Sequence, residues 1–280
     1  MKTILITGIN GFLGSNLAKA LLKDYNIIGL EHSINEFHRL RGFDFKIYCA
    51  ENVIPEELFT EQKIDIIIHT ATFYGRQNEK IESIANANLF MPFNLLERAI
   101  AHNCCFFFNT DTVLDRFVSP YSLTKRQFQE WLYLRCGEIK VVNMKLEHFY
   151  GPGASTENFI TSMIERLKRN EASIDLTLGE QQRDFTYIDD VVSAFMVVLG
   201  KAEELNAPFN EYQVTTQKPI TIKQLLQILK EITKSTSILN FGAIPYRKNE
   251  LMRSESDNSS LKALGWEPEY TIIEGLLKTI

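Results

Sequence analysis

The sequence predicts an α/β fold with a doubly wound parallel sheet. Two observations lead to this prediction: short apolar runs alternate with segments of helical periodicity, and three glycines follow the first apolar run at three-residue spacing. Strands joined by helical crossovers run parallel in one sheet. The 280 residues allow one large domain, or one domain with a smaller appendage.

The glycines lie in the opening stretch MKTILITGINGFLG. The apolar run at 4–6 is followed by Gly8, Gly11 and Gly14, and a helical pattern of leucines begins in the same stretch. In such a turn the backbone approaches a pyrophosphate, which the N–H groups and dipole of the helix N-terminus attract. We therefore predict a Rossmann dinucleotide site. Its expected cofactor contacts are Gly8, Asn10, Gly11, Phe12, Leu13 and Gly14.

The net charge of −5, with scattered Lys and Arg, favours neither nucleic acid nor an anionic membrane as a partner. No apolar run reaches transmembrane length, and the chain enters its first strand without a signal peptide, so we expect a cytoplasmic protein. The four cysteines, at 49, 104, 105 and 136, lack metal-ligand spacing. We expect them to be reduced core residues and expect no metal site.

The second predicted strand ends at Glu31. An acidic side chain at this point hydrogen-bonds the adenosine ribose and repels a 2′-phosphate, so Glu31 favours NAD. His32, Arg39 and Arg41 are near enough in sequence to supply positive charge, which leaves NADP(H) open. A third strand in FKIYCAEN brings Glu51 as a further cofactor-binding candidate.

The remaining strands and helices of the first half should meet at one sheet edge. A strand is expected over 64–72, a helix over 84–101, a strand over 104–109 and a helix over 119–136. Ser119 suits the N-cap of the last helix and Pro120 its first position. Ligands of such sheets bind beyond the carboxyl ends of the strands. That edge would bring together the glycine turn, residues 109–111 and the helix carrying Tyr121 and Lys125.

Motifs along nearly the whole chain resemble the extended short-chain dehydrogenase/reductase family of nucleotide-sugar epimerases, dehydratases and reductases. They are TGINGFLG, HTA (69–71), NTD (109–111), YSLTK (121–125), YGPG (150–153), RDFTYIDD (183–190) and LGWEP (264–268). The resemblance implies that Tyr121 is the acid/base and Lys125 its activator, and that Thr110 hydrogen-bonds the sugar oxygen. It also implies that Ala71, Tyr121 and Lys125 contact the cofactor.

Chemistry supports these roles independently. A tyrosine with a pKa of ~10 is a poor acid or base near neutrality. Tyr121 and Lys125 are four residues apart and share one helix face. We expect the Lys125 ammonium, together with an oxidised nicotinamide, to lower the pKa of Tyr121 by favouring the phenolate.

The domain prediction is a dinucleotide-binding Rossmann domain over 1–150. Residues 151–280 form mainly a smaller, discontinuous substrate-binding portion, with some segments returning to the first domain. By the resemblance, Asp111, His148, Arg183 and Arg247 contact the substrate with Thr110, although relatives carry asparagine where this chain has His148. The guanidinium groups suit a diphosphate. Asp189 and Asp190 are expected to cap a helix over 191–199.

The stretch NTDTVLD limits the reactions that the sequence allows. The similar dTDP-glucose 4,6-dehydratases carry Thr-Asp-Glu where this chain has Thr110, Asp111 and Thr112. A threonine cannot act as the carboxylate base, so a 4,6-dehydratase is not expected. Either 4-epimerisation or reduction of a 4-keto group remains.

Further stretches favour reduction. PYSLTKRQFQE, VNMKLEHFYGPG and FGAIPYRKNELM resemble the CDP-abequose synthase-like nucleotide-sugar 4-ketoreductases. The resemblance implies NAD(P)H-dependent reduction at C4 of a CDP-linked 4-keto-6-deoxy or 3,6-dideoxy hexose for O-antigen. Two alternatives stay open. One is a 4-epimerase that retains NAD, and the other is a non-catalytic dinucleotide-binding module, which would be expected to lack Tyr121 or Lys125.

The resemblance also implies a homodimer. In relatives the helices corresponding to 84–101 and 119–136 form a four-helix contact between subunits. Phe128, Leu132 and Leu134 could supply the apolar surface here, but packing of the core would use the same residues.

Overall fold

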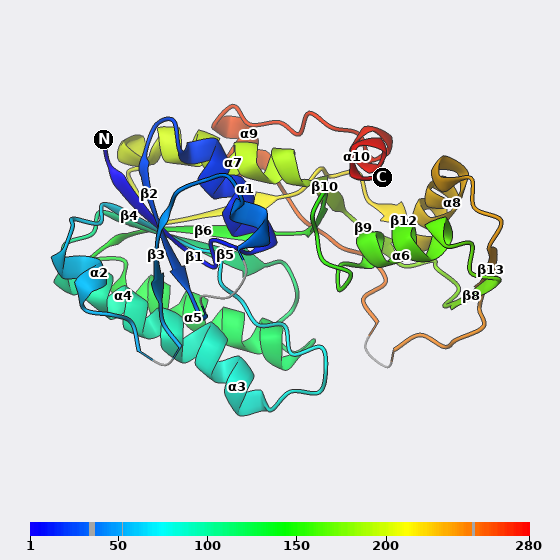
Figure 1. Ribbon diagram of the computed structural model, residues 1–280, viewed down its shortest axis with the longest axis horizontal. Helices are drawn as coiled ribbons and strands as arrows, with labels where there is room; N and C mark the ends of the chain where they lie inside the picture. The colour runs from blue at the N-terminus through cyan, green and yellow to red at the C-terminus, as the bar shows by residue number, and fades with distance from the viewer. Residues whose placement is uncertain (34–36, 52, 248–249) are drawn as a thin grey trace. The chain divides into compact units, whose positions relative to one another are not determined.

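The structure is a computed structural model that describes residues 1–33, 37–51, 53–247 and 250–280 (Figure 1). The chain divides into two compact units. The first unit comprises residues 1–146 and 195–212, and the second comprises 147–194 and 213–280. Within the described ranges, no helix combines the length and apolarity needed to span a bilayer.

The first unit is built on a seven-stranded sheet with the order β11-β6-β5-β4-β1-β2-β3. Its strands are β1 (Thr3–Thr7), β2 (Asn26–Glu31), β3 (Lys46–Cys49), β4 (Ile66–His69), β5 (Phe106–Thr112), β6 (Lys140–Leu146) and β11 (Phe209–Val214). The pairings among β1 to β6 are all parallel, which confirms the predicted fold class. Chain order reverses between β1 and β4, and the carboxyl ends of these neighbours form the ligand edge of such a sheet.

Helices cover both faces of this sheet. They are α1 (Phe12–Leu21), α2 (Glu57–Thr60), α3 (Ile81–Ala85), α4 (Met91–Ala101) and α5 (Pro120–Arg135). Figure 1 shows α3, α4 and α5 on one face and α1 on the other. Because both faces are covered, β1 and β4 are buried at every position and have apolar runs without alternation. Phe128 and Leu132 on α5 lie in the core, whereas Leu134 is exposed.

The helix expected over 84–101 begins at Ile81 and contains a π-helical segment, η2 (Asn86–Phe90). Asn88 in this segment is buried. Its Oδ1 accepts a hydrogen bond from the Phe73 N–H at 2.8 Å, and its Nδ2 donates to the Phe73 carbonyl at 2.8 Å. The helix is therefore tied to the loop after β4, an arrangement that helical periodicity does not reveal.

Two strand boundaries differ from prediction. β4 ends at His69 rather than at 72, and β5 runs from 106 to 112 rather than from 104 to 109. The Cys104 N–H still bonds to the carbonyl of Ala99 at the end of α4, so β5 begins after it. The cysteines are free, as expected, but only Cys104 is buried. The expectation that all four lie in the core is wrong, because Cys105 is exposed and Cys49 and Cys136 are half-buried.

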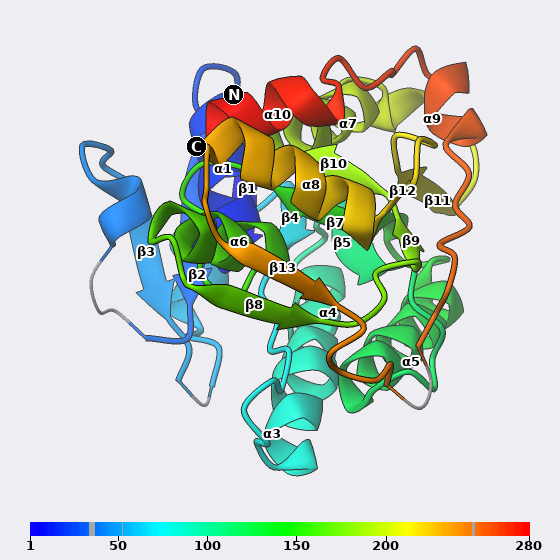
Figure 2. The same ribbon diagram turned by 90° about the vertical axis from the view of Figure 1, so that its right-hand side faces the viewer.

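The second unit contains three pairs of short strands. β7 (His148–Tyr150) pairs with β10 (Phe185–Tyr187), β9 (Gln182–Arg183) with β12 (Ile220–Thr221), and β8 (Ser173–Leu176) with β13 (Ile238–Phe241). Its helices are α6 (Phe159–Lys168), α8 (Ile222–Thr233), α9 (Ser259–Ala263) and α10 (Ile272–Thr279), and α7 (Ile188–Gly200) begins in it. α8 packs against α6 and α10 (Figure 2).

Asp189 and Asp190 do not cap a helix over 191–199. α7 begins at Ile188, which places both residues in its first turn. Asp190 is buried, and its carboxylate accepts hydrogen bonds from the N–H groups of Glu269 at 2.8 Å and Tyr270 at 3.2 Å. The side chain therefore anchors the segment before α10, a contact between residues almost eighty positions apart.

We predict that Asp190→Ala lowers the free energy of unfolding by about 2 kcal/mol, because two backbone N–H groups lose their acceptor. Asp190→Asn keeps one acceptor oxygen and should lose less. Asp189→Ala is the matched control. This neighbouring side chain is exposed and forms a hydrogen bond with the Tyr270 side chain, so its loss should cost about 1 kcal/mol or less. Denaturant unfolding measures all three variants. Equal stability of the two alanine variants would contradict the anchoring role.

Candidate active site

The turn between β1 and α1 has no room for side chains at two glycines. Gly8 has a φ of +66°, in the left-handed region. A Cβ atom added to Gly8 would lie 2.9 Å from the Cα of Ala71, and one added to Gly14 would lie 2.2 Å from the Gly8 carbonyl oxygen. The turn therefore closes on itself and on the loop after β4. It has the shape expected of a phosphate cradle.

α1 begins directly after this turn. Its N-cap is Gly11, which has no side chain to cap the helix, and no acidic residue lies in the first turn. The positive end of the helix dipole therefore lies at the turn. An anionic group suits this position, and the residues present fit the pyrophosphate of a dinucleotide.

Two charged side chains form hydrogen bonds with the backbone of Asn10 in the same turn. Glu31, at the end of β2, accepts a hydrogen bond from the Asn10 N–H at 2.5 Å, and Arg39 donates to the Asn10 carbonyl at 3.2 Å. Burial raises the pKa of Glu31 and lowers the pKa of Arg39. Arg41 and Glu51 are both exposed. The structure thus brings Glu31 and Arg39 to the glycine turn.

The carboxyl end of β5 carries Thr110 and Asp111, both buried. The Thr110 hydroxyl donates to the carbonyl of His69 at 2.9 Å. Asp111 accepts hydrogen bonds on both oxygens, from the Thr112 N–H at 2.8 Å and from Asn143 at 3.0 Å. Burial raises the pKa of Asp111.

The predicted start of α5 is confirmed. Ser119 is the N-cap, it forms a capping box with Ser122, and Pro120 follows in the first turn. This local structure fixes Tyr121 in the first turn and Lys125 one turn later. Lys125 is 2% exposed, and burial lowers its pKa to about 8 although the charge of Asp111 acts in the other direction.

The expected lowering of the Tyr121 pKa is wrong for the structure described. Burial raises this pKa well above its usual value, and Tyr74 and Asp111 add to the rise. Side-chain hydrogen bonding with Thr112 and Thr72 acts in the opposite direction but is outweighed. Tyr121 is therefore a protonated phenol at neutral pH.

Sequence reasoning missed Tyr74 and Arg76, which follow β4. The rings of Tyr74 and Tyr121 lie 4.9 Å apart between centroids, and the Arg76 guanidinium lies 4.3 Å from the centre of the Tyr74 ring. The only signal was the aromatic and basic stretch FYGR after HTA, in a loop that sequence patterns do not place.

In the second unit two of the predicted substrate residues, Arg183 and His148, have acidic neighbours. Arg183 pairs with Glu250 at 2.6 Å. The Glu250 N–H bonds to the carbonyl of Arg247, and Arg247 is exposed. Nδ1 of His148 lies 3.6 Å from a carboxylate oxygen of Glu147, whose side chain is fully buried.

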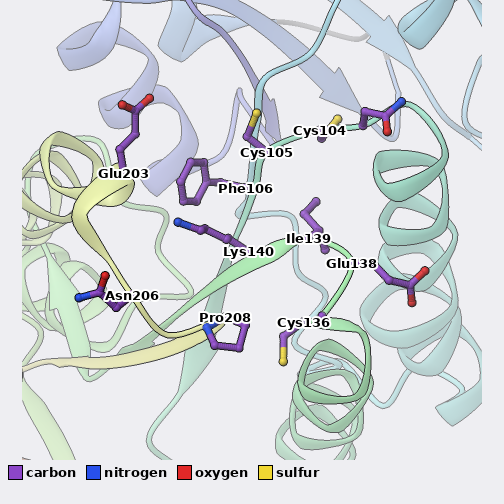
Figure 3. Close-up of a pocket in the computed structure, with 12 residues that line it drawn as sticks. Cys104, Cys105, Phe106, Cys136, Glu138, Ile139, Lys140, Glu203, Asn206 and Pro208 are labelled. Carbon is purple, nitrogen blue, oxygen red and sulfur yellow. The ribbon is translucent and has the colours of Figure 1, made fainter.

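A cavity of about 630 Å³ lies elsewhere on the first unit (Figure 3). Its lining includes Cys105, Phe106 and Lys140, from the amino ends of β5 and β6. Thr110 and Asp111 lie toward the carboxyl end of β5. The cavity therefore does not coincide with the candidate site, and it contains none of the predicted site residues.

Residues 4–211 match the model of the NAD dependent epimerase/dehydratase family. The chain belongs to this family. The predicted family and enzyme class, an NAD(P)-dependent oxidoreductase, are thereby confirmed. Family membership does not decide between NAD and NADP.

The family member CDP-abequose synthase of Salmonella typhimurium is 34% identical to this chain, over 99% of this chain and 98% of its own length. The CDP-abequose synthase of Salmonella muenchen is also 34% identical, over 100% of this chain and 97% of its own length. Among solved structures, UDP-glucose 4-epimerase of Thermotoga maritima is 26% identical. It covers 99% of this chain and 97% of its own, with a TM-score of 0.84.

We predict that Gly14→Ala weakens binding of NAD(H) by about tenfold or more, since overpacking typically costs about 1–3 kcal/mol. Gly137→Ala is the matched control, because a Cβ atom there meets no heavy atom within 4 Å. Calorimetric titration with the cofactor measures both variants. Unchanged affinity in Gly14→Ala would show that the turn does not hold the cofactor.

Proposed function

We propose that this enzyme reduces the C4 keto group of a CDP-linked 4-keto-6-deoxy or 3,6-dideoxy hexose, in synthesis of sugars for surface polysaccharide or O-antigen. The observation that carries the proposal is the full-length similarity to two CDP-abequose synthases, each 34% identical. Thr112 supports it, because the carboxylate that a 4,6-dehydratase uses is replaced by a hydroxyl.

The cofactor would bind at the carboxyl edge of the first unit. Gly8, Gly11 and Gly14, with Asn10, Phe12 and Leu13, would hold its pyrophosphate, and Ala71 and Glu51 would contribute further contacts. Glu31 favours NADH because a carboxylate repels a 2′-phosphate. Arg39 contacts the glycine turn at the Asn10 carbonyl, and its positive charge acts against this preference. We infer that NADH binds at least as well as NADPH.

When bound, the nicotinamide supplies the hydride that reduces C4. Tyr121 then protonates the new alkoxide. The phenol is protonated at neutral pH, so it holds the proton that the reduction consumes. Lys125 supports Tyr121 electrostatically and contacts the cofactor ribose. Thr110 orients the keto oxygen by turning its O–H from the His69 carbonyl to the sugar.

Residues of the second unit would hold the nucleotide. Arg183 and Arg247 would bind the diphosphate, because two guanidinium groups match its oxygens bidentately. Arg183 would exchange the carboxylate of Glu250 for phosphate. His148 would donate from its ring to a phosphate or hydroxyl, with Glu147 behind it.

We also propose that the enzyme is a homodimer that pairs α4 and α5 of two subunits. Phe90, Trp131, Tyr133 and Leu134 are large apolar side chains exposed on or beside these helices. A contact that covers them would remove apolar surface from water. Phe128 and Leu132 take no part, since both lie in the core.

A 4-epimerase is the second candidate, favoured by the similarity to the Thermotoga maritima enzyme. An epimerase transfers hydride twice and keeps its cofactor, whereas a reductase releases oxidised cofactor after one transfer. We predict that the purified enzyme oxidises one NADH or NADPH for each CDP-4-keto sugar and yields a single C4 configuration. Absorbance of the nicotinamide and chromatography of the product measure this ratio. Steady interconversion of 4-epimers without added cofactor would favour the epimerase.

We predict that Tyr121→Phe lowers kcat by about 10²–10⁴-fold, the usual contribution of general acid–base catalysis. The phenyl ring keeps the packing against Tyr74, so cofactor affinity should stay within about twofold. Steady-state kinetics and cofactor titration measure the two effects. Tyr133→Phe, on an exposed tyrosine of the same helix, is the control and should leave kcat unchanged. A Tyr121→Phe enzyme with near-normal turnover would remove the assignment.

A further inference from the structure

A buried polar network lies behind the carboxyl end of β5. At its centre, Asn143 on β6 donates from Nδ2 to a carboxylate oxygen of Asp111 and to one of Glu211, each at 3.0 Å. Its Oδ1 accepts from Nδ2 of Asn109 at 2.8 Å. Asn109 and Asn143 have no exposed surface, and Asp111 is 5% exposed. One amide thus joins a carboxylate at the catalytic edge to another on β11.

Two carboxylates in such a network require positive charge nearby, since an uncompensated buried charge is strongly destabilising. Glu211 has Lys145, whose Nζ lies 2.7 Å from Oε1, and Gln129 donates to Oε2 at 2.5 Å. Asp111 accepts hydrogen bonds from two neutral donors, Asn143 and the Thr112 N–H. The positive charges that act on Asp111 are those of Lys125 and, more weakly, Lys145.

The relation between Asp111 and Lys125 is mutual. Lys125 is 2% exposed, and Asp111 is the acidic group that favours its charged form. Asp111 also disfavours ionisation of Tyr121. His69 lies near the same lysine but is uncharged, because burial and the ammonium lower its pKa. One negative charge therefore favours the protonated form of both Tyr121 and Lys125.

We propose that Asp111 is a positioning residue, the buried counter-charge that keeps Lys125 an ammonium and Tyr121 a phenol, and that Asn143 holds its carboxylate in place. Each Asp111 oxygen already accepts a hydrogen bond within the protein, and this role is an alternative to the substrate contact expected from the sequence. The part that Asp111 plays in catalysis rests on the proposed function, whereas its effect on the charge of Lys125 does not.

The first test is stability against pH in protein without ligands. The folded-state pKa of Lys125, about 8, is below its usual 10.5, so the unfolded chain binds more protons between these values. Lys125 therefore makes the free energy of unfolding of the wild-type protein rise between pH 8 and 10.5, and Lys125→Met should lack this rise. In Asp111→Asn that rise should begin about one pH unit lower, because an opposite charge is gone.

Controls separate this effect from general damage. Asp115→Asn removes an equal charge from the exposed loop after β5 and should leave the rise in place. Asn143→Ala should move the rise to lower pH, as Asp111→Asn does. If Asp111→Asn does not fold, Asn143→Ala takes its place in the test. In a Lys125→Met background, Asp111→Asn should leave the pH dependence of stability between pH 7 and 10.5 unchanged. A rise that stays at its wild-type pH in both Asp111→Asn and Asn143→Ala would overturn the proposal.

The second test is the pH profile of turnover. Asp111→Asn should move the basic limb of kcat down by about one pH unit while KM for the CDP-sugar stays within about twofold. A raised KM with an unmoved basic limb would make Asp111 a substrate ligand and overturn the proposal. If the enzyme reduces no 4-keto sugar, the proposed function fails, and the stability measurements still decide the role of Asp111.

Discussion

The burial of the Lys125 ammonium is the constraint on which the site depends. A charged amine removed from water costs several kcal/mol unless opposite charge and polar groups compensate. The Asp111 carboxylate supplies this charge. Asn143 hydrogen-bonds that carboxylate, and Asn143 is in turn bonded to Asn109 and Glu211, so the network draws on three strands of the sheet. A helix, α5, carries the lysine, and a capping box at Ser119 fixes where the helix begins. The position and charge of the Lys125 side chain thus involve four elements of the first unit, α5, β5, β6 and β11.

The same environment keeps Tyr121 protonated. Burial and the neighbouring carboxylate of Asp111 raise its pKa, so the side chain is a phenol at neutral pH. Reduction of a ketone consumes a proton at the new alkoxide, and an alkoxide is a stronger base than a phenolate, so the phenol can supply it. An epimerase needs the same phenol in one of its two transfers. It is therefore the full-length similarity to the CDP-abequose synthases that favours reduction.

The candidate anion-binding groups of the two units differ in kind. In the first unit they are backbone groups: Gly8 and Gly14 allow a close approach of the chain, and the start of α1 contributes its dipole. In the second unit they are side chains with acidic neighbours: Arg183 pairs with Glu250, and His148 lies near Glu147. In the proposed function a diphosphate would compete with the carboxylate of Glu250 for Arg183.

The sequence by itself determined the parallel sheet, the glycine turn, the start of α5 and the family, because each follows from local periodicity, capping or a short motif. It also placed Thr110, Asp111, Tyr121 and Lys125 at one edge, since the carboxyl ends of parallel strands meet there. Only the tertiary structure decided the charge state of Tyr121, the partners of Asp111 and the anchoring by Asp190. Burial and contacts between distant segments set these properties. In the sequence, Asn143 and Glu211 have the pattern of ordinary strand residues. Once β6 and β11 are neighbours, Asn143 bonds both to Glu211 and to the carboxylate that the buried lysine requires.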